Sequence, residues 1–185
     1  QNIAGDPPAP FTGQVWYNTT AGTAKYFFVD PGSWATGGTM NTARRTFAGA
    51  GTKTSALASG GGQPTVAKTE SYNGTSWTEV NDLNQARLRL TGCGADNTAA
   101  LAVSGEVAPG VSAINEIWNG TNWTEVNNLN TARQDATAEG TSTAALFFGG
   151  GLPPGDGTIY NSTELWNGTN WTEVNNLNTA RNKPS

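Results

Sequence analysis

The residues of this chain that could do chemistry are carboxylates at recurring positions. One glutamate precedes an aromatic residue by two positions and another follows a tryptophan by two, and the set comprises Glu70, Glu116, Glu164, Glu79, Glu125 and Glu173. Paired carboxylates can hydrolyse glycosides when two of them face one sugar about 5–10 Å apart. Carboxylates that occur once per repeat are instead expected to satisfy the equally repeated arginines and loop amides. We therefore predict no catalytic residues and a protein that is not an enzyme.

Few residues of the sequence could bind a metal ion or act as a nucleophilic thiol. The sequence contains no histidine, and Cys93 is its one cysteine. A lone cysteine among small residues is usually a small buried hydrophobe, so we expect that role for Cys93. Asp156, which lies between two glycines, could help to bind a cation, although one carboxylate is far from a full calcium shell. No metal and no cofactor are predicted.

A repeat positions all of these residues. The stretch 118–133, WNGTNWTEVNNLNTAR, returns unchanged at 166–181, with four changes at 72–87 and in a weaker form at 29–44. Its last arginines, Arg44, Arg87, Arg133 and Arg181, are spaced by 43, 46 and 48 residues, and so are the tryptophans Trp34, Trp77, Trp123 and Trp171. This length is typical of a four-stranded propeller blade, for which about 40–50 residues is usual.

Each repeat is expected to contain four strands, because apolar residues make up only 36% of a chain rich in Gly, Asn and Thr, which are poor helix formers. An Asn-Gly pair between the third and fourth strands predicts a type I′ hairpin turn. Small residues of the first two strands are expected nearest the axis, and the aromatic residues between blades. The predicted structural residues of the repeat are Tyr72, Trp77, Trp118, Trp123, Trp166, Trp171, Arg44, Arg87, Arg133 and Arg181.

The predicted organisation is all-β. Residues 1–12 are a Pro-rich linker, 13–43 a β-hairpin with a partial blade, 44–86, 87–132 and 133–181 three full blades, and 182–185 a tail. Three full repeats are fewer than the usual 4–8 blades of a propeller. The chain is therefore expected to be part of a longer propeller or to form a homo-oligomer; closure as a small four-bladed ring is the third alternative.

Certain motifs resemble a known family. They are Gly60-Gly61 with Tyr72 and Trp77, a weaker Ser104-Gly105 with Trp118 and Trp123, and Gly149-Gly150 with Trp166 and Trp171. This pattern resembles the kelch repeat over residues 33–181 and implies a kelch and galactose-oxidase-like β-propeller. The copper chemistry of galactose oxidase requires histidine, which is missing here. The Asn/Thr-rich style also looks like tail-fibre and virion proteins of marine tailed phages.

Specificity is expected where the repeats differ. The loop between the second and third strands reads GQPTVAKT at 62–69, EVAPGVSAIN at 106–115 and GLPPGDGTIYNS at 151–162. Variable loops on a constant scaffold commonly form recognition surfaces. The candidate ligand-binding residues are Gln63, Lys68, Glu106, Asp156 and Tyr160. The alternative is that these loops have drifted and contact nothing.

The net charge of the chain limits the kinds of partner that it is expected to bind. The net charge is −4, with a pI near 4.7, which argues against nucleic acid as a partner, and no apolar run is long enough to insert in a membrane. We predict a structural and adhesive propeller module of a phage virion, as a tail fibre, spike or capsid appendage. It would be extracellular or virion-borne and would bind a host-surface glycan or another virion protein. The alternative is a secreted bacterial carbohydrate-binding propeller or a glycan-active enzyme.

Overall fold

The computed structural model describes residues 2–7, 14–26, 36–62, 64–153 and 156–182. Within them every regular element is a β-strand, as the composition predicts. The chain divides into two compact units, Gln1–Thr36 and Gly37–Ser185. Trp34, which belongs to the weakest copy of the repeat, lies outside the described residues.

The first unit is a three-stranded sheet. The predicted hairpin is present as β2 (Val15–Asn18) and β3 (Thr23–Tyr26), which pair antiparallel. A short strand that the sequence did not predict, β1 (Asn2–Ile3), pairs parallel with β2. The carboxylate of Asp6 accepts hydrogen bonds from Lys25, Asn18 and Trp16, and these bonds lower the pKa of Asp6.

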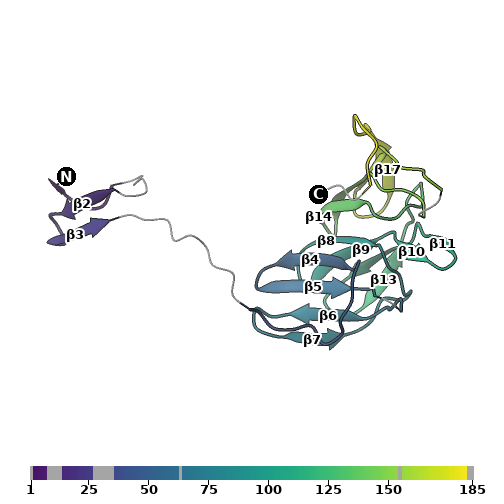
Figure 1. The fold of residues 1–185 in the computed structure, drawn as a ribbon, viewed down its shortest axis with the longest axis horizontal. Coiled ribbons are helices and arrows are strands. Elements are labelled where there is room, and N and C mark those ends of the chain that lie inside the picture. The colour runs from purple at the N-terminus through teal and green to yellow at the C-terminus, as the bar shows by residue number, and fades with distance from the viewer. Residues whose placement is uncertain (1, 8–13, 27–35, 63, 154–155, 183–185) are drawn as a thin grey trace. The chain divides into compact units, whose positions relative to one another are not determined.

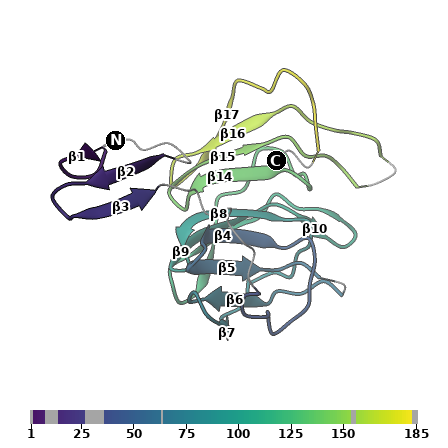
Figure 2. The ribbon, with the colours of Figure 1, turned by 60° about the vertical axis from the view of Figure 1, so that its left-hand side comes forward.

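The second unit contains three four-stranded antiparallel sheets, one for each full repeat (Figures 1 and 2). Sheet 1 consists of β4 (Ala48–Thr52), β5 (Ser55–Ser59), β6 (Thr69–Tyr72) and β7 (Trp77–Val80). Sheet 2 consists of β8 (Thr91–Asp96), β9 (Ala99–Val103), β12 (Asn115–Trp118) and β13 (Trp123–Val126). Sheet 3 consists of β14 (Thr137–Thr141), β15 (Ala144–Phe148), β16 (Thr163–Trp166) and β17 (Trp171–Val174). The four strands predicted for each repeat are all present.

Two local features differ from the prediction. The loop after β9 forms a small hairpin of its own, β10 (Glu106–Val107) and β11 (Gly110–Val111). The Asn-Gly turn is not type I′, because only the glycine has a positive φ, 91° at Gly120. The side chain of Asn119 instead accepts hydrogen bonds from the backbone N–H groups of Thr121 and Asn122, both at 2.9 Å. Asparagine serves here as a side-chain cap within a four-residue loop.

The first strands of the three sheets lie side by side, with β8 between β4 and β14 (Figure 2). Glycine permits this approach: a Cβ on Gly92 would lie 3.0 Å from Ala48 Cβ and 3.1 Å from the Gly49 carbonyl oxygen. This confirms the prediction that the first strands carry small residues where neighbouring sheets crowd together.

The core lies between successive sheets. We call the side of each sheet that carries the two aromatic residues its rear face, and the opposite side its forward face. Leu57 on the forward face of sheet 1 packs against Trp118 and Trp123 on the rear face of sheet 2. Leu101 on the forward face of sheet 2 packs in the same way against Trp166 and Trp171 of sheet 3. As predicted, the aromatic residues of sheets 2 and 3 fill the space between sheets.

Candidate recognition rim

The third-strand glutamates are held by arginines from the preceding linker. Arg87, which precedes sheet 2, donates to Glu116 of that sheet at 2.9 Å, and Arg133 donates to Glu164 of sheet 3 at 2.8 Å. Arg44 and Glu70 form the same pair in sheet 1. All of these side chains are buried. The prediction that these carboxylates satisfy the repeated arginines is therefore confirmed for three of the four arginines; Arg181 is exposed and forms no such pair among the described residues.

An asparagine completes each of these contacts. Asn84 donates both its backbone N–H and its side-chain amide to Glu116 Oε2, at 2.7 and 2.8 Å. With Arg87 donating to Oε1, both oxygens of this carboxylate accept hydrogen bonds. Burial lowers the pKa of Arg87, and the neighbouring charge of Glu116 opposes that shift. We call this unit, an asparagine and an arginine from one linker holding the glutamate of the next sheet, the linker clasp.

The fourth-strand glutamates are arranged differently. Glu79 pairs with Lys68 at 2.7 Å, whereas Glu125 and Glu173 are exposed to solvent. Glu125 lies directly opposite Glu116 across the β12–β13 pair, but Glu116 is committed to its linker clasp. The two rows of carboxylates therefore lie in different environments in the described chain, the third-strand row buried and paired and the fourth-strand row exposed.

A shallow cleft of about 200 Å³ runs along the inner strands. Its walls are the small residues of β4, β8 and β14, with Cys93 and Glu139 as the reactive side chains. Cys93 is buried, as predicted, and burial, with a smaller contribution from Glu139, raises the pKa of its thiol from 9.0 to about 12. The thiol is therefore a poor nucleophile in the folded protein.

This shift predicts slow alkylation of Cys93. Each pKa unit changes the thiolate fraction tenfold, so iodoacetamide at about pH 8 should react roughly 1,000-fold more slowly with the folded chain than with the chain unfolded in guanidinium chloride. Because the folded pKa is raised, the neutral thiol favours the fold below pH 9.0, and this contribution falls as the pH rises from 9.0 towards 12. A folded rate within tenfold of the unfolded rate would contradict the burial of this thiol.

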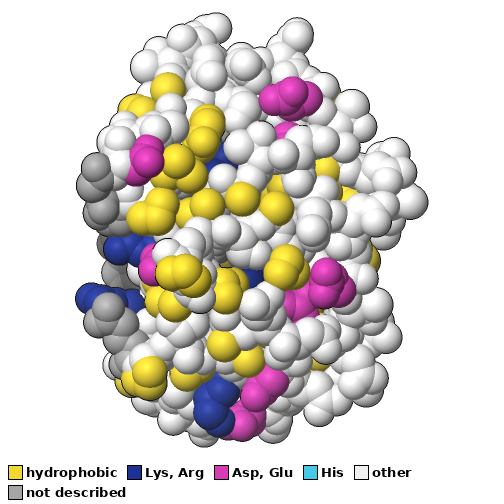
Figure 3. All heavy atoms as spheres, turned by 90° about the vertical axis from the view of Figure 1, so that its right-hand side faces the viewer, with side chains coloured by type: hydrophobic (Ala, Val, Ile, Leu, Met, Phe, Trp, Pro, Cys, Tyr) yellow, Lys and Arg dark blue, Asp and Glu magenta, His cyan; other side chains and the backbone are white. Residues whose placement is uncertain are grey.

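The variable loops lie at the end of the sheets where the first strands begin. In sheet 1 the register pairs Ala48 with Ser59, so the loop after Ser59 starts beside the linker before Ala48. The loop after β9 likewise returns to its linker, where Glu106 and Leu88 exchange backbone hydrogen bonds. In Figure 2 the long loops of sheets 2 and 3 project on the same side. Figure 3 shows one face of the molecule, which has apolar side chains through its middle and separate acidic and basic groups around them.

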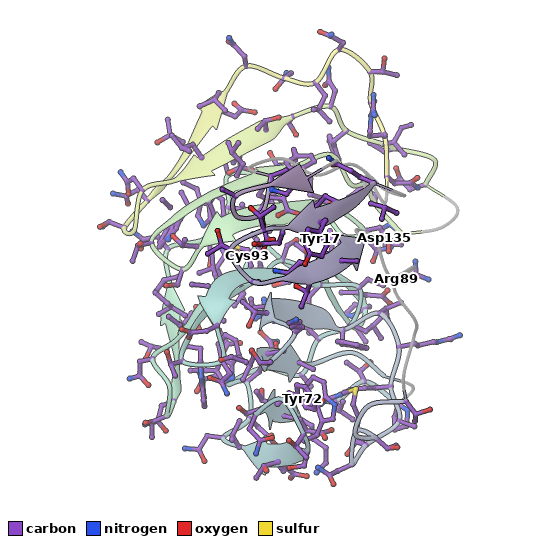
Figure 4. All side chains as sticks on the ribbon, turned by 90° about the vertical axis from the view of Figure 1, so that its left-hand side faces the viewer. Tyr17, Tyr72, Arg89, Cys93 and Asp135 are labelled. Carbon is purple, nitrogen blue, oxygen red and sulfur yellow. The ribbon has the colours of Figure 1, made fainter. Side chains whose placement is uncertain are left out.

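A charged cluster joins the loops at this end, which we call the rim. Arg89 donates to Asp135 at 2.8 Å and lies 3.3 Å from Glu106, and its side chain is 28% exposed. Arg89 and Asp135 lie close together in Figure 4. Thr46, Arg89 and Asp135 occupy the same repeat position and all have φ near +50°, at 52°, 54° and 53°. Such a backbone is uncommon for residues other than glycine, and strained positions cluster at functional sites.

Backbone hydrogen bonds join these left-handed residues from repeat to repeat. Arg89 N–H donates to the Thr46 carbonyl at 2.9 Å, and Asp135 N–H donates to the Arg89 carbonyl at 3.2 Å. Next to Asp135, the side chain of Gln134 is 1% exposed and neither amide atom has a hydrogen-bond partner within the described structure. No sequence signal identifies these roles, because the residue type at this position differs in every repeat.

The predicted rim residues are placed as follows. Glu106 joins the Arg89 cluster, whereas Lys68 is occupied by Glu79. Asp156 is exposed and accepts a hydrogen bond from Thr158. Tyr160 is half-buried, and its backbone bonds to Gly150 and Arg181. Gln63 lies outside the described residues.

Similarity to known proteins and groups of metal-binding residues place few constraints on the function. No family model matches the chain, and no curated protein matches it. Among the described residues, no group of three or more His, Cys, Asp or Glu side chains could hold a metal ion. Asp156 therefore belongs to no such group within that part of the chain. The described chain also has no helix long and apolar enough to cross a membrane.

Proposed function

We propose that the three sheets are blades of a kelch-like β-propeller and that the chain is a non-enzymatic structural and adhesive module. The phage virion is the proposed setting, as a tail fibre, spike or capsid appendage. The rim would bind a host-surface glycan or a neighbouring virion protein. Support for the blades comes from three sheets of the same strand order and closely similar register that pack face to face, with small residues on their first strands.

The observation that carries the proposal is the position of the variation. The linker clasp and a stacked aromatic pair recur in all three repeats, whereas the loops that differ gather at one end beside Arg89, Glu106 and Asp135. A guanidinium offers donors in a fixed plane, carboxylates accept from hydroxyl groups, and a tyrosine adds an amphipathic ring. This set of groups suits the hydroxyl pattern of a sugar.

The contrary function is a glycan-active enzyme or a secreted bacterial carbohydrate-binding propeller. An enzyme requires two titratable groups that face one substrate. The buried glutamates are occupied by linker clasps, and their fourth-strand neighbours are exposed on separate blades. This arrangement favours binding over hydrolysis.

A glycan array tests the rim. Arg89→Gln should reduce binding of any recognised glycan by about tenfold to a hundredfold, because a charged hydrogen bond contributes about 1.5–3 kcal/mol. Glu125→Gln, a change of an exposed residue outside the rim, is the matched control and should bind as the unaltered chain does. If fourth-strand changes abolish binding and rim changes do not, the assignment of the rim is wrong.

A further inference from the structure

The first and last sheets of the second unit each expose one side of the sheet-to-sheet interface that occurs twice within this unit. Sheet 1 packs on sheet 2, and sheet 2 on sheet 3, each by a forward face against a rear face. Among the described residues of this unit, the forward face of sheet 3 and the rear face of sheet 1 have no such partner. The question is what these two faces bind.

The forward face of sheet 3 exposes three apolar residues, and one of them, Leu146, is buried at the equivalent position of both other sheets. Leu146 is 40% exposed, whereas its equivalents Leu57 and Leu101 are 2% and 1% exposed. Leu165, directly opposite Leu146 on the neighbouring strand, is 41% exposed, and Val174 is 38% exposed. Three large aliphatic side chains on one sheet face form the kind of exposed patch that marks an interaction surface.

A buried hydroxyl on the same face also lacks its partner. In the first internal interface, Trp123 Nε1 donates to Thr69 Oγ1 at 3.0 Å. The register places Thr163 of sheet 3 at the position of Thr69, since both pair with the last valine of their sheet. Thr163 Oγ1 is buried and has no hydrogen-bond partner in the described structure. The forward face of sheet 3 therefore lacks both a donor for this hydroxyl group and an apolar surface that would cover its aliphatic side chains.

The rear face of sheet 1 offers these groups. Tyr72 and Trp77 stack with ring centroids 5.0 Å apart, much like the 5.3 Å of Trp118 and Trp123. The pair in sheet 1 is only half-buried, whereas Trp118 and Trp123 are 2% and 6% exposed. Trp77 occupies the repeat position of Trp123, so its indole N–H matches the unpartnered hydroxyl of Thr163.

We propose that a second copy of this chain docks head to tail, with the rear face of its sheet 1 on the forward face of sheet 3. The occupant is indicated by continuity: this contact would bring together the same repeat positions as the two internal interfaces do. It would cover Leu146 and Leu165 with Tyr72 and Trp77 of the second copy and give Thr163 Oγ1 its donor. The docking rests on the repeat geometry and does not depend on what the rim binds.

The linker clasp accommodates this contact. The tetrapeptide Asn41–Arg44, which holds Glu70, is identical in sequence to 178–181, where Arg181 is exposed. Either tetrapeptide can therefore hold Glu70 at the junction, and the other is released. Exchange of identical clasps is close to neutral in free energy, so burial of the apolar faces drives association. A head-to-tail contact closes into a ring or continues as a chain, according to its rotation.

Sedimentation velocity over a concentration series tests the docking. The full chain should associate, and Leu165→Lys should weaken association at least about a hundredfold, because a lysine would be buried there without a partner. Ile159→Lys is the control: Ile159 is 47% exposed but lies in the rim loop, so this variant should associate normally. Far-UV circular dichroism verifies that both variants are folded. A monomeric unaltered chain, or association of Leu165→Lys equal to that of the control, would overturn the proposal.

Mixing two variants tests the polarity of the contact. Ala56→Arg places a charge on the rear face of sheet 1, where the equivalent residues Ala100 and Ala145 are 1% and 3% exposed. Ala56→Arg and Leu165→Lys should each be monomeric alone, yet an equal mixture should form heterodimers, because each keeps one intact face. Association of Ala56→Arg by itself would indicate a symmetric contact between forward faces and would contradict the head-to-tail arrangement.

Discussion

Glu116→Gln is expected to lower the free energy of unfolding by about 3–5 kcal/mol. The glutamine keeps the shape of the side chain but removes its charge, which leaves the guanidinium of Arg87 buried without a counterion. Both side chains are almost fully inaccessible to solvent, at 0% and 1%. Water cannot enter to solvate the unpaired cation, so the full desolvation penalty remains. Urea denaturation followed by tryptophan fluorescence measures this loss.

Glu125→Gln is the matched control for this experiment. Glu125 lies directly opposite Glu116 in the β12–β13 pair but is exposed. The same substitution there should change stability by no more than about 0.5 kcal/mol, as is usual for surface positions. Equal losses in the two variants would mean that the buried pair is not what holds the linker between sheets 1 and 2.

Trp123→Ala should cost about 3–5 kcal/mol, the usual range for removal of a buried tryptophan. The indole packs between two sheets, is 6% exposed and donates to Thr69 across the interface. Trp77→Ala, at the same position of the preceding repeat, should cost roughly half as much, since its ring is only half-buried and the hydrophobic contribution follows the area covered.

This pair of variants compares identical chemistry in two settings. Thermal unfolding of both proteins, at a concentration low enough to keep them monomeric, gives the difference directly. Similar losses would show that the rear face of sheet 1 is as well covered as the internal faces. The head-to-tail docking proposed above would then lose one of its two surfaces.

Much of the fold follows from the repeat in the sequence. The strands of sheets 1–3 begin and end near the residues expected for them, because glycine, asparagine and the alternation of side chains determine local backbone geometry. The turn type is the exception at this level. The prediction of type I′ assumed a two-residue loop at Asn-Gly, whereas the loop has four residues and the Asn119 side chain caps it.

The contacts between repeats required the tertiary structure. The sequence shows that the residue types of Arg87 and Glu116 recur in each repeat. The spacing of these residues does not show whether an arginine contacts the glutamate of its own repeat or that of the next one. The structure places each arginine against the sheet that follows it. Arg181, with no described sheet after it, is exposed although its sixteen-residue context is identical to that of Arg133.

The residues of the rim were also only partly predictable from the sequence. Comparison of the loops identified Glu106 as a candidate, because variation between copies is visible in the sequence. Arg89 and Asp135 were not identified, since each is one side chain within a linker and only the packing of inner strands brings them to 2.8 Å. The sequence by itself determined the repeat, its strands and its variable loops, all of which depend on local chemistry. Tertiary structure alone decided which copies of an identical motif are buried, because burial depends on the neighbouring sheet.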